Sequence, residues 1–278
     1  LWIHEKGGWL WEKQCIPFDA ATELLSERID QQKTGENYHL RGVAYLAHKQ
    51  YDKAIADFSE SLRLQPENAG AVNNRGQTRY LMEDYKAAVQ DYTAAIAIDA
   101  KNPLVLNNRA LAYLELNDLN NAMIDLQEAL KLVPQYPEAL NNRGVVYQQR
   151  LEFDKAIADF TEALKLDSKY VDALENRALS YVETNDHAKA IADLESAIQL
   201  SPHSYEAAND LAWLLATTPE DSVRNGQRAL TLAKQACAVT EYKQWNTLDT
   251  LAAAYAANGQ FADARQWLGT ALTLAPEN

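Results

Sequence analysis

The sequence predicts an all-α protein built from about seven stacked helix-turn-helix repeats, preceded by a short β-hairpin. Three observations lead to this fold class. The same residue types return every 34 positions, as in "NNRG" at 73–76, "NNRA" at 107–110 and "NNRG" at 141–144. Within each period, apolar residues fall three and four apart, which is helical spacing. A short polar turn separates the two apolar runs, so each period is predicted to be a pair of helices.

Residues 1–17 differ from the rest of the chain and are predicted to form the β-hairpin. The stretch "LWIHEKGGWLWEKQCIPF" places tryptophan and isoleucine on both sides of a Gly7-Gly8 turn. It resembles the tail of a small SH3-like barrel. Because two strands are not stable alone, we expect this hairpin to pack on the helices or on sequence beyond this chain.

Residues 18–34 are predicted to form one capping helix. Ala21 and Leu25 stand four apart, like Ala54 and Phe58 in the second helix of the first repeat. The segment therefore looks like half a repeat, and it is expected to cover the first full one.

Residues 35–204 are predicted to form five regular repeats. A typical one is 137–170, "PEALNNRGVVYQQRLEFDKAIADFTEALKLDSKY", which contains two apolar stripes with helical spacing. Asp154 is expected to cap its second helix, because a carboxylate accepts hydrogen bonds from the free N–H groups of a first turn. Proline closes several repeats, where it can follow a helix end: Pro66, Pro134, Pro202 and Pro276.

Residues 205–278 are predicted to form two divergent repeats. The helix "YEAANDLAWLLA" runs into "TTPEDSVRNG", an insertion of about five residues relative to the 34-residue period. We expect Pro219 to open a turn and Asp221 or Ser222 to cap the next helix, the alternative being a ligand-binding loop. The last helix is expected to leave an apolar strip for a partner subunit or for further chain.

The pattern over about residues 35–278 resembles the tetratricopeptide repeat family, whose 34-residue units place small, aromatic and apolar residues at fixed offsets. The resemblance implies a right-handed α-solenoid whose first helices line a concave groove. The small position holds Gly42, Gly76, Ala110, Gly144, Ala178, Ala212 and Ala252. The apolar position of the second helix holds Phe58, Tyr92, Leu126, Phe160, Leu194, Ala233 and Leu268.

Five repeats carry an arginine before the small residue and an aspartate 16 positions later. Repeats six and seven have leucine instead of the arginine, and Leu232 and Trp267 instead of the aspartate. Because both charges disappear together, we infer that they pair across the two helices of one repeat. This favours a structural role over a catalytic one. The predicted ion pairs are Arg41–Asp57, Arg75–Asp91, Arg109–Asp125, Arg143–Asp159 and Arg177–Asp193.

Asparagine recurs directly before the arginine, often with a second asparagine beside it. The resemblance implies that this offset faces the groove, where an amide offers the backbone of an extended peptide both a donor and an acceptor. The alternative is that these amides bond neighbouring repeats or water. The candidate peptide-binding residues are Asn73, Asn74, Asn107, Asn108, Asn141, Asn142 and Asn176, together with Gln77, Tyr80, Leu111 and Trp213.

The composition argues against several other functions. A net charge of −13 and a pI near 4.8 argue against nucleic acid or an anionic membrane as the main partner. No apolar run reaches the roughly 18 residues of a membrane span. Histidine and cysteine show no metal-ligand spacing, and no nucleophile or phosphate-loop motif occurs. No enzyme activity, metal or cofactor is therefore predicted.

The leading prediction is a protein–protein interaction scaffold that binds an extended peptide or partner segment in the concave groove. The partner is expected to be neutral to basic, because acidic residues lie at the edge of that groove. One alternative is a structural module that self-associates through its terminal helices; another is a regulatory arm of a larger protein. The chain begins at Leu1, which predicts an excised or processed piece, and its compartment is left open between bacterial cytoplasm and periplasm.

Overall fold

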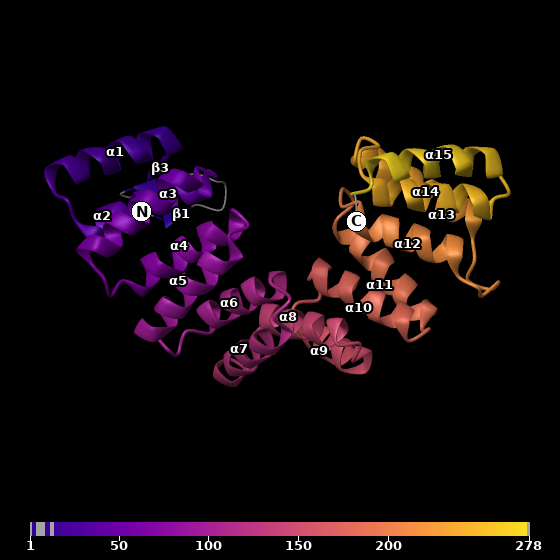
Figure 1. The fold of residues 1–278 in the computed structure, drawn as a ribbon, viewed down its shortest axis with the longest axis horizontal. Coiled ribbons are helices and arrows are strands. Elements are labelled where there is room, and N and C mark those ends of the chain that lie inside the picture. Colours follow the sequence, from indigo (N-terminus) through magenta and orange to yellow (C-terminus); the bar gives the residue numbers. More distant parts are fainter. Residues whose placement is uncertain (1, 4–8, 12–13, 277–278) are drawn as a thin grey trace. The chain divides into compact units, whose positions relative to one another are not determined.

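The computed structural model describes residues 2–3, 9–11 and 14–276. In this part of the chain, three short strands are followed by fifteen α-helices (Figure 1). The helices divide between two compact halves, Leu1–Pro134 and Gln135–Asn278, and each half is described by itself. The all-α fold predicted from the 34-residue period is confirmed.

The N-terminal strands form an antiparallel sheet in the order β1-β2-β3, with bounds Trp2–Ile3, Trp9–Trp11 and Gln14–Ile16. Leu10 of the central strand lies opposite both Trp2 and Cys15. The prediction had two strands, whereas the described residues contain three. The predicted Gly7-Gly8 turn lies outside the described residues. Strand β2 contacts helix α1 (Phe18–Gln31), which is the element available to cover the sheet.

The N-terminal half contains three helix pairs after α1. The pairs are α2 (Gly35–Ala47) with α3 (Tyr51–Leu64), α4 (Ala69–Leu81) with α5 (Tyr85–Ile98), and α6 (Pro103–Glu115) with α7 (Leu119–Leu132). Helix α4 also packs on α3, and α6 on α5, so the first helix of each of these pairs contacts the second helix of the pair before it. Helix α1 does the same for α2, and its Ala21 and Leu25 are fully buried.

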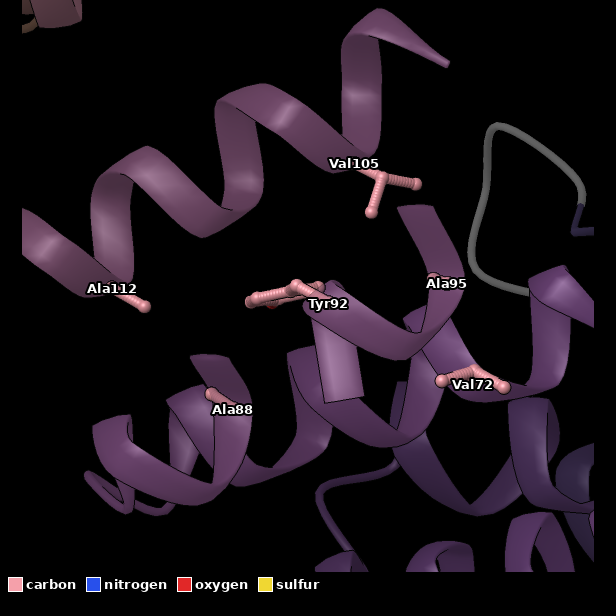
Figure 2. Close-up of a cluster of buried hydrophobic side chains, with 6 residues drawn as sticks. All are labelled: Val72, Ala88, Tyr92, Ala95, Val105 and Ala112. Atoms are coloured by element: carbon pink, nitrogen blue, oxygen red, sulfur yellow. The ribbon is translucent and has the colours of Figure 1, made fainter. Parts of the chain in front are cut away.

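The core lies between successive helices rather than at one centre. In Figure 2, Tyr92 and Ala95 of α5 lie between Val72 of α4 and Val105 of α6. The Tyr92 side chain is only 2% exposed. Burying an aromatic ring of this size contributes more to stability than any alanine around it. Each repeat thus shares its largest side chain with its neighbour, which is why one repeat is not stable alone.

The C-terminal half contains four helix pairs. They are α8 (Pro137–Gln149) with α9 (Phe153–Leu166), α10 (Val171–Glu183) with α11 (His187–Leu200), α12 (Glu206–Thr217) with α13 (Gly226–Val239), and α14 (Trp245–Ala257) with α15 (Phe261–Leu274). Helix α10 packs on α9, α12 on α11 and α14 on α13, as in the N-terminal half. The inserted residues lie between α12 and α13.

The small residue of the first helix is matched to the apolar residue 16 positions later. A Cβ atom added to Gly144 would lie 2.5 Å from the Phe160 ring, and one added to Gly76 would lie 2.9 Å from the Tyr92 ring. Such distances are far inside van der Waals contact, so an aromatic ring at this place requires glycine. The repeats with leucine in the second helix have alanine instead, as in Ala110 and Leu126.

The turn inside each regular repeat contains one residue with a left-handed backbone. These residues recur every 34 positions with φ between 57° and 62°: Lys49, Glu83, Asn117, Leu151 and Asn185. The seventh repeat has glycine there, Gly259, with φ 74°. Asparagine and glycine adopt this conformation easily, whereas a leucine does so at a cost.

The caps of two helices differ from the sequence prediction. Residue Asp154 lies inside the first turn of α9, and the cap residue is Glu152, whose side chain makes no capping hydrogen bond. Helix α13 is capped by Asn225, which accepts a hydrogen bond from the Arg228 N–H, and not by Asp221 or Ser222. In both places several polar residues stand close together, and only the backbone path decides which one reaches the free N–H groups.

Candidate functional site

The predicted arginine–aspartate pairs are present in all five regular repeats. Each guanidinium donates from Nε and Nη2 to the two carboxylate oxygens, for example at 2.7 and 2.7 Å between Arg109 and Asp125. The same fork joins the other four pairs: Arg41–Asp57, Arg75–Asp91, Arg143–Asp159 and Arg177–Asp193. The Asp125 hydrogen bonds raise the pKa of Arg109. These charges hold the two helices of one repeat together.

A second contact of these arginines was not predicted. Nη1 of Arg109 donates to the Thr93 hydroxyl at 3.0 Å, and Thr93 belongs to the helix before it, α5. Arg41 and Arg177 do the same with Ser26 and Thr161. One guanidinium therefore joins three helices. The sequence signal for this contact was a hydroxyl residue 15 or 16 positions before four of the arginines, and it was hidden because the residue is serine in two places, threonine in two and Gln127 before Arg143.

In the N-terminal half, the predicted amides bond one another. Asn108 Nδ2 donates to Asn73 Oδ1 at 3.2 Å, which links α6 to α4. Asn73 in turn donates to Asn74 Oδ1 at 3.3 Å, and Asn74 Nδ2 lies 2.9 Å from His39 Nε2 on α2. We call this chain of side-chain amides the amide ladder. Its hydrogen bonds are those expected if the amides bond neighbouring repeats, which is the alternative to peptide binding.

The same arrangement occurs in the C-terminal half. Asn176 Nδ2 donates to Asn141 Oδ1 at 3.1 Å, and Asn141 donates to Asn142 Oδ1 at 3.4 Å. Asn141 and Asn142 are buried, whereas Asn176 is half-buried. Like Asn108, Asn176 uses one amide hydrogen in this bond; its second amide hydrogen and its carbonyl oxygen make no other side-chain bond within the described residues. A peptide-binding role therefore stays a prediction for the half-buried members.

The ladder changes its chemistry at α10 and α12. The next residues in the two asparagine rows are Glu175 and Asp210. Oε1 of Glu175 is buried and has no hydrogen-bond partner in the described part of the chain. Burial, and then the charges of Glu206, Asp172 and Asp210, raise the pKa of Glu175 to about 7. Burial also raises the pKa of Asp210. Two carboxyl groups thus stand where other repeats have an amide pair.

The other predicted peptide-binding residues differ in exposure. Gln77 is exposed and Leu111 is half-buried. Tyr80 is half-buried, and its hydroxyl donates to Glu115 of α6 at 3.2 Å. Burial and the Glu115 charge raise the pKa of Tyr80 to about 12. Trp213 on α12 is 44% exposed, which is unusual for the largest side chain and marks it as available for contact.

Two hollows meet at Trp213. One, of about 250 Å³, lies among α10, α11 and α12 and is lined by Leu179, Val182 and Asp210, among others. The other, of about 470 Å³, lies among α12, α14 and α15 and includes Asp249 and Phe261. Each hollow has mostly apolar walls and one carboxylate in its lining.

The described residues contain no group of three histidine, cysteine or carboxylate side chains able to hold a metal ion. None of the helices searched there is long and apolar enough to cross a membrane. Cys237 is a buried free thiol whose pKa is raised by burial, and its Sγ lies 3.2 Å from the Thr247 carbonyl oxygen. The structure thus assembles polar and apolar surfaces in the described residues.

Family models described as tetratricopeptide repeats match most of the chain: residues 39–103, 112–150, 137–170, 175–238 and 246–275. No matched model reaches residues 1–38, so the SH3-like likeness has no support there. A search of curated proteins finds no significant match.

Many solved structures share the fold. A chain of the APC/C hetero-tetramer Cut9–Hcn1 superposes with a TM-score of 0.75 at 19% identity, covering 85% of this chain and 46% of that one. This chain thus spans less than half the length of that relative. A tetratricopeptide repeat protein from Parabacteroides merdae gives a TM-score of 0.62 at 19% identity, covering 93% and 95%. YrrB, described as having an unusual peptide-binding site, gives 0.54 at 22%, covering 68% and 98%.

Proposed function

Because the chain belongs to the tetratricopeptide repeat family, we propose that it is a protein–protein interaction scaffold and that it binds an extended partner segment along its first helices. The observation that carries the proposal is that the side-chain amides of Asn108 and Asn176 each make one side-chain hydrogen bond within the described residues. Each is half-buried and keeps a donor and an acceptor, which is the pair a peptide backbone needs. The likeness to YrrB, itself described as peptide-binding, is in keeping with this use of the fold.

The test places a photo-crosslinking amino acid at single positions of the full chain. Gln77, Leu111 and Trp213 lie on first helices, and exposed Ile124 and Lys165 on second helices are the matched controls. The proposal expects one partner to be captured from the first-helix positions and not from the controls. Equal capture from both sets, or capture from Ile124 and Lys165 alone, contradicts it.

The amides are then tested with the captured partner. Asn108→Ala combined with Asn176→Ala is expected to weaken partner binding by about tenfold, because each lost backbone hydrogen bond contributes about 0.5–1.5 kcal/mol. The control changes Asn120, an exposed residue on second helix α7, to alanine. If the double variant binds as tightly as the control variant, the amide ladder is structural only, and the groove binds through other residues.

One observation favours self-association as a second candidate. Helix α15 exposes Phe261 at 67% and Leu272 at 69%, and its Leu268 and Leu274 are nearly half exposed. An apolar strip of this kind is typical of a surface covered by another chain. Light scattering over a concentration series distinguishes the two candidates, since a monomer at every concentration contradicts self-association and leaves the scaffold proposal intact.

A further inference from the structure

The hollow at Trp213 combines an apolar wall with a carboxylate. Leu179 and Val182 of α10 and Leu214 of α12 supply apolar surface, and Asp210 supplies the charge. Leu179 is 40% exposed and Trp213 is 44% exposed, so large apolar groups face solvent beside the half-buried Asp210. The volume of about 250 Å³ suits one long side chain rather than a drug-sized ligand.

Buried acceptors on the two first helices beside this hollow lack donors, although Asn185, His187, Thr217 and Thr218 in its lining carry donor groups. Oε1 of Glu175 and Oδ1 of Asn209 are buried without a hydrogen-bond partner in the described residues, and the Asn209 side chain is only 9% exposed. The Asn209 amide nitrogen is the one donor that reaches Asp210, at 3.4 Å. A buried acceptor without a donor costs free energy, so this cluster favours a ligand that brings N–H groups.

Within the described residues, no cation pairs with the acidic groups beside this hollow. Burial, and then the charges of Glu206, Asp172 and Asp210, raise the pKa of Glu175, and none of these four carboxyl groups forms an ion pair there. Arg177, two residues after Glu175, pairs with Asp193, and Lys169, three residues before Asp172, forms no ion pair with the cluster among the described residues. His187 also lines the hollow, but its Nδ1 lies 3.2 Å from the Glu220 carboxylate.

We propose that the hollow bounded by Leu179, Asp210 and Trp213 receives a basic side chain, lysine or arginine, of the extended partner segment; the inference rests on the proposed scaffold function. The hydrocarbon stem packs on Leu179 and Val182, and the cationic head donates to Asp210 and Glu175. The Trp213 indole adds a cation–π contact, which tryptophan makes best among the aromatic residues. A metal ion is disfavoured because the described carboxylates form no metal-binding group of three.

The neighbouring hollow predicts a second residue of the partner segment. It shares Trp213 and is walled by Ala252, Phe261 and Leu268, so it fits an apolar side chain. First helices pack about 9–10 Å apart, and an extended chain rises about 3.3 Å per residue. The partner segment is therefore expected to carry an apolar residue about three positions from the basic one.

The experiment uses the full chain, labelled with nitrogen-15, and three small probes. N-acetyl-lysine methylamide and N-acetyl-arginine methylamide carry the cation, and N-acetyl-norleucine methylamide carries the lysine stem without its charge. The Trp213 indole N–H resonance is followed during each titration. The two basic probes are expected to shift it saturably, with an affinity at least about tenfold above that of the norleucine probe.

Two matched variants remove one carboxylate each. Asp210→Asn is expected to weaken lysine-probe binding by about tenfold and leave norleucine-probe binding unchanged. Asp221→Asn makes the same change at an exposed position of the inserted loop, and is expected to leave both unchanged. Equal binding of lysine and norleucine probes, equal effects of the two variants, or no saturable shift with either basic probe overturns the inference.

The result is separable from the proposed function. A crosslinked partner that binds Asp210→Asn as tightly as the unaltered chain sinks the basic-residue inference and leaves the scaffold in place. Failure of first-helix crosslinking sinks the scaffold proposal, whatever the small probes do.

Discussion

At the scale of single residues, the arginine of four of the five regular repeats joins three helices. Its fork holds the aspartate 16 residues later, and in four of the repeats its third nitrogen reaches a hydroxyl of the preceding helix. The Asp125 side chain is only 4% exposed. A buried carboxylate of this kind is stabilised by the arginine that pairs with it. When the aspartate is removed, the arginine is left with an uncompensated charge.

Asp125→Ala is accordingly expected to lower the free energy of unfolding by about 3 kcal/mol, measured by urea denaturation. The control is Glu60→Ala, which removes a surface ion pair with Arg63 on one helix and is expected to lower the free energy of unfolding far less. Equal losses in the two variants would show that the fork is no stronger than a surface pair.

Glu175 gives a pH dependence with a defined sign. Its folded-state pKa of about 7 lies above the ordinary value of 4.5. Between these two pH values, the Glu175 carboxyl group is protonated in the folded chain and ionised in the unfolded chain. Stability contributed by this group therefore falls as pH rises from 4.5 through 7. Glu175→Gln is expected to raise the free energy of unfolding by about 1 kcal/mol at pH 8, after allowance for partial solvent screening, and by little at pH 4.

The measurement is urea denaturation of both chains at the two pH values. The matched control is Glu183→Gln on the exposed end of the same helix, for which a change below about 0.5 kcal/mol is expected at either pH. A gain that is equal at pH 4 and pH 8 would exclude Glu175 titration as its cause.

At the scale of helices, the crossing inside each repeat is set by a matched pair. Gly144 allows the Phe160 ring to lie against the backbone of α8. Gly144→Ala is expected to destabilise the chain by about 1–3 kcal/mol through overpacking. Gly144→Ala with Phe160→Leu reproduces the Ala110 and Leu126 combination of another repeat. This double variant is expected to recover part of the loss in a double-mutant cycle, and additive losses would contradict the matching.

The turn between two helices of a repeat offers a gain in stability. Leu151 adopts φ 59° and is 74% exposed, whereas Asn117 and Asn185 occupy the equivalent place in neighbouring repeats. Leu151→Asn is expected to raise the free energy of unfolding by about 1 kcal/mol, because asparagine tolerates the left-handed backbone better than leucine. The reverse change, Asn117→Leu, is expected to lower it by a similar amount. A loss in Leu151→Asn would contradict the assignment of strain to this turn.

Helices, repeats and ion pairs were predictable because each depends on a spacing that the sequence repeats five or more times. The arginine–aspartate pairs were visible through their joint loss in the last two repeats. The role of the amides was not predictable, since an amide that can bond a peptide backbone can equally bond another amide. The caps of α9 and α13 and the hollow at Trp213 depend on how backbones are placed in space, and no interval in the sequence records this.

At the scale of the whole molecule, the net charge of −13 acts on any basic partner before contact is made. Charges of opposite sign accelerate association, and salt screens them over about 10 Å at 0.1 M. The proposed partner is therefore expected to associate about tenfold more slowly when salt rises from about 50 to 500 mM, while its dissociation changes less. Stopped-flow binding measures both rates, and an association rate that is independent of salt would contradict a basic partner.

Helix α1 supplies Ser26 to Arg41, just as α3, α5 and α9 supply a hydroxyl to the arginine of the repeat that follows them. The arginine–aspartate fork is the same in all five regular repeats, and both partners lie within one 34-residue block. An in-frame gene duplication of one block therefore inserts a copy that brings its own ion pair, so the array can lengthen by whole repeats during evolution.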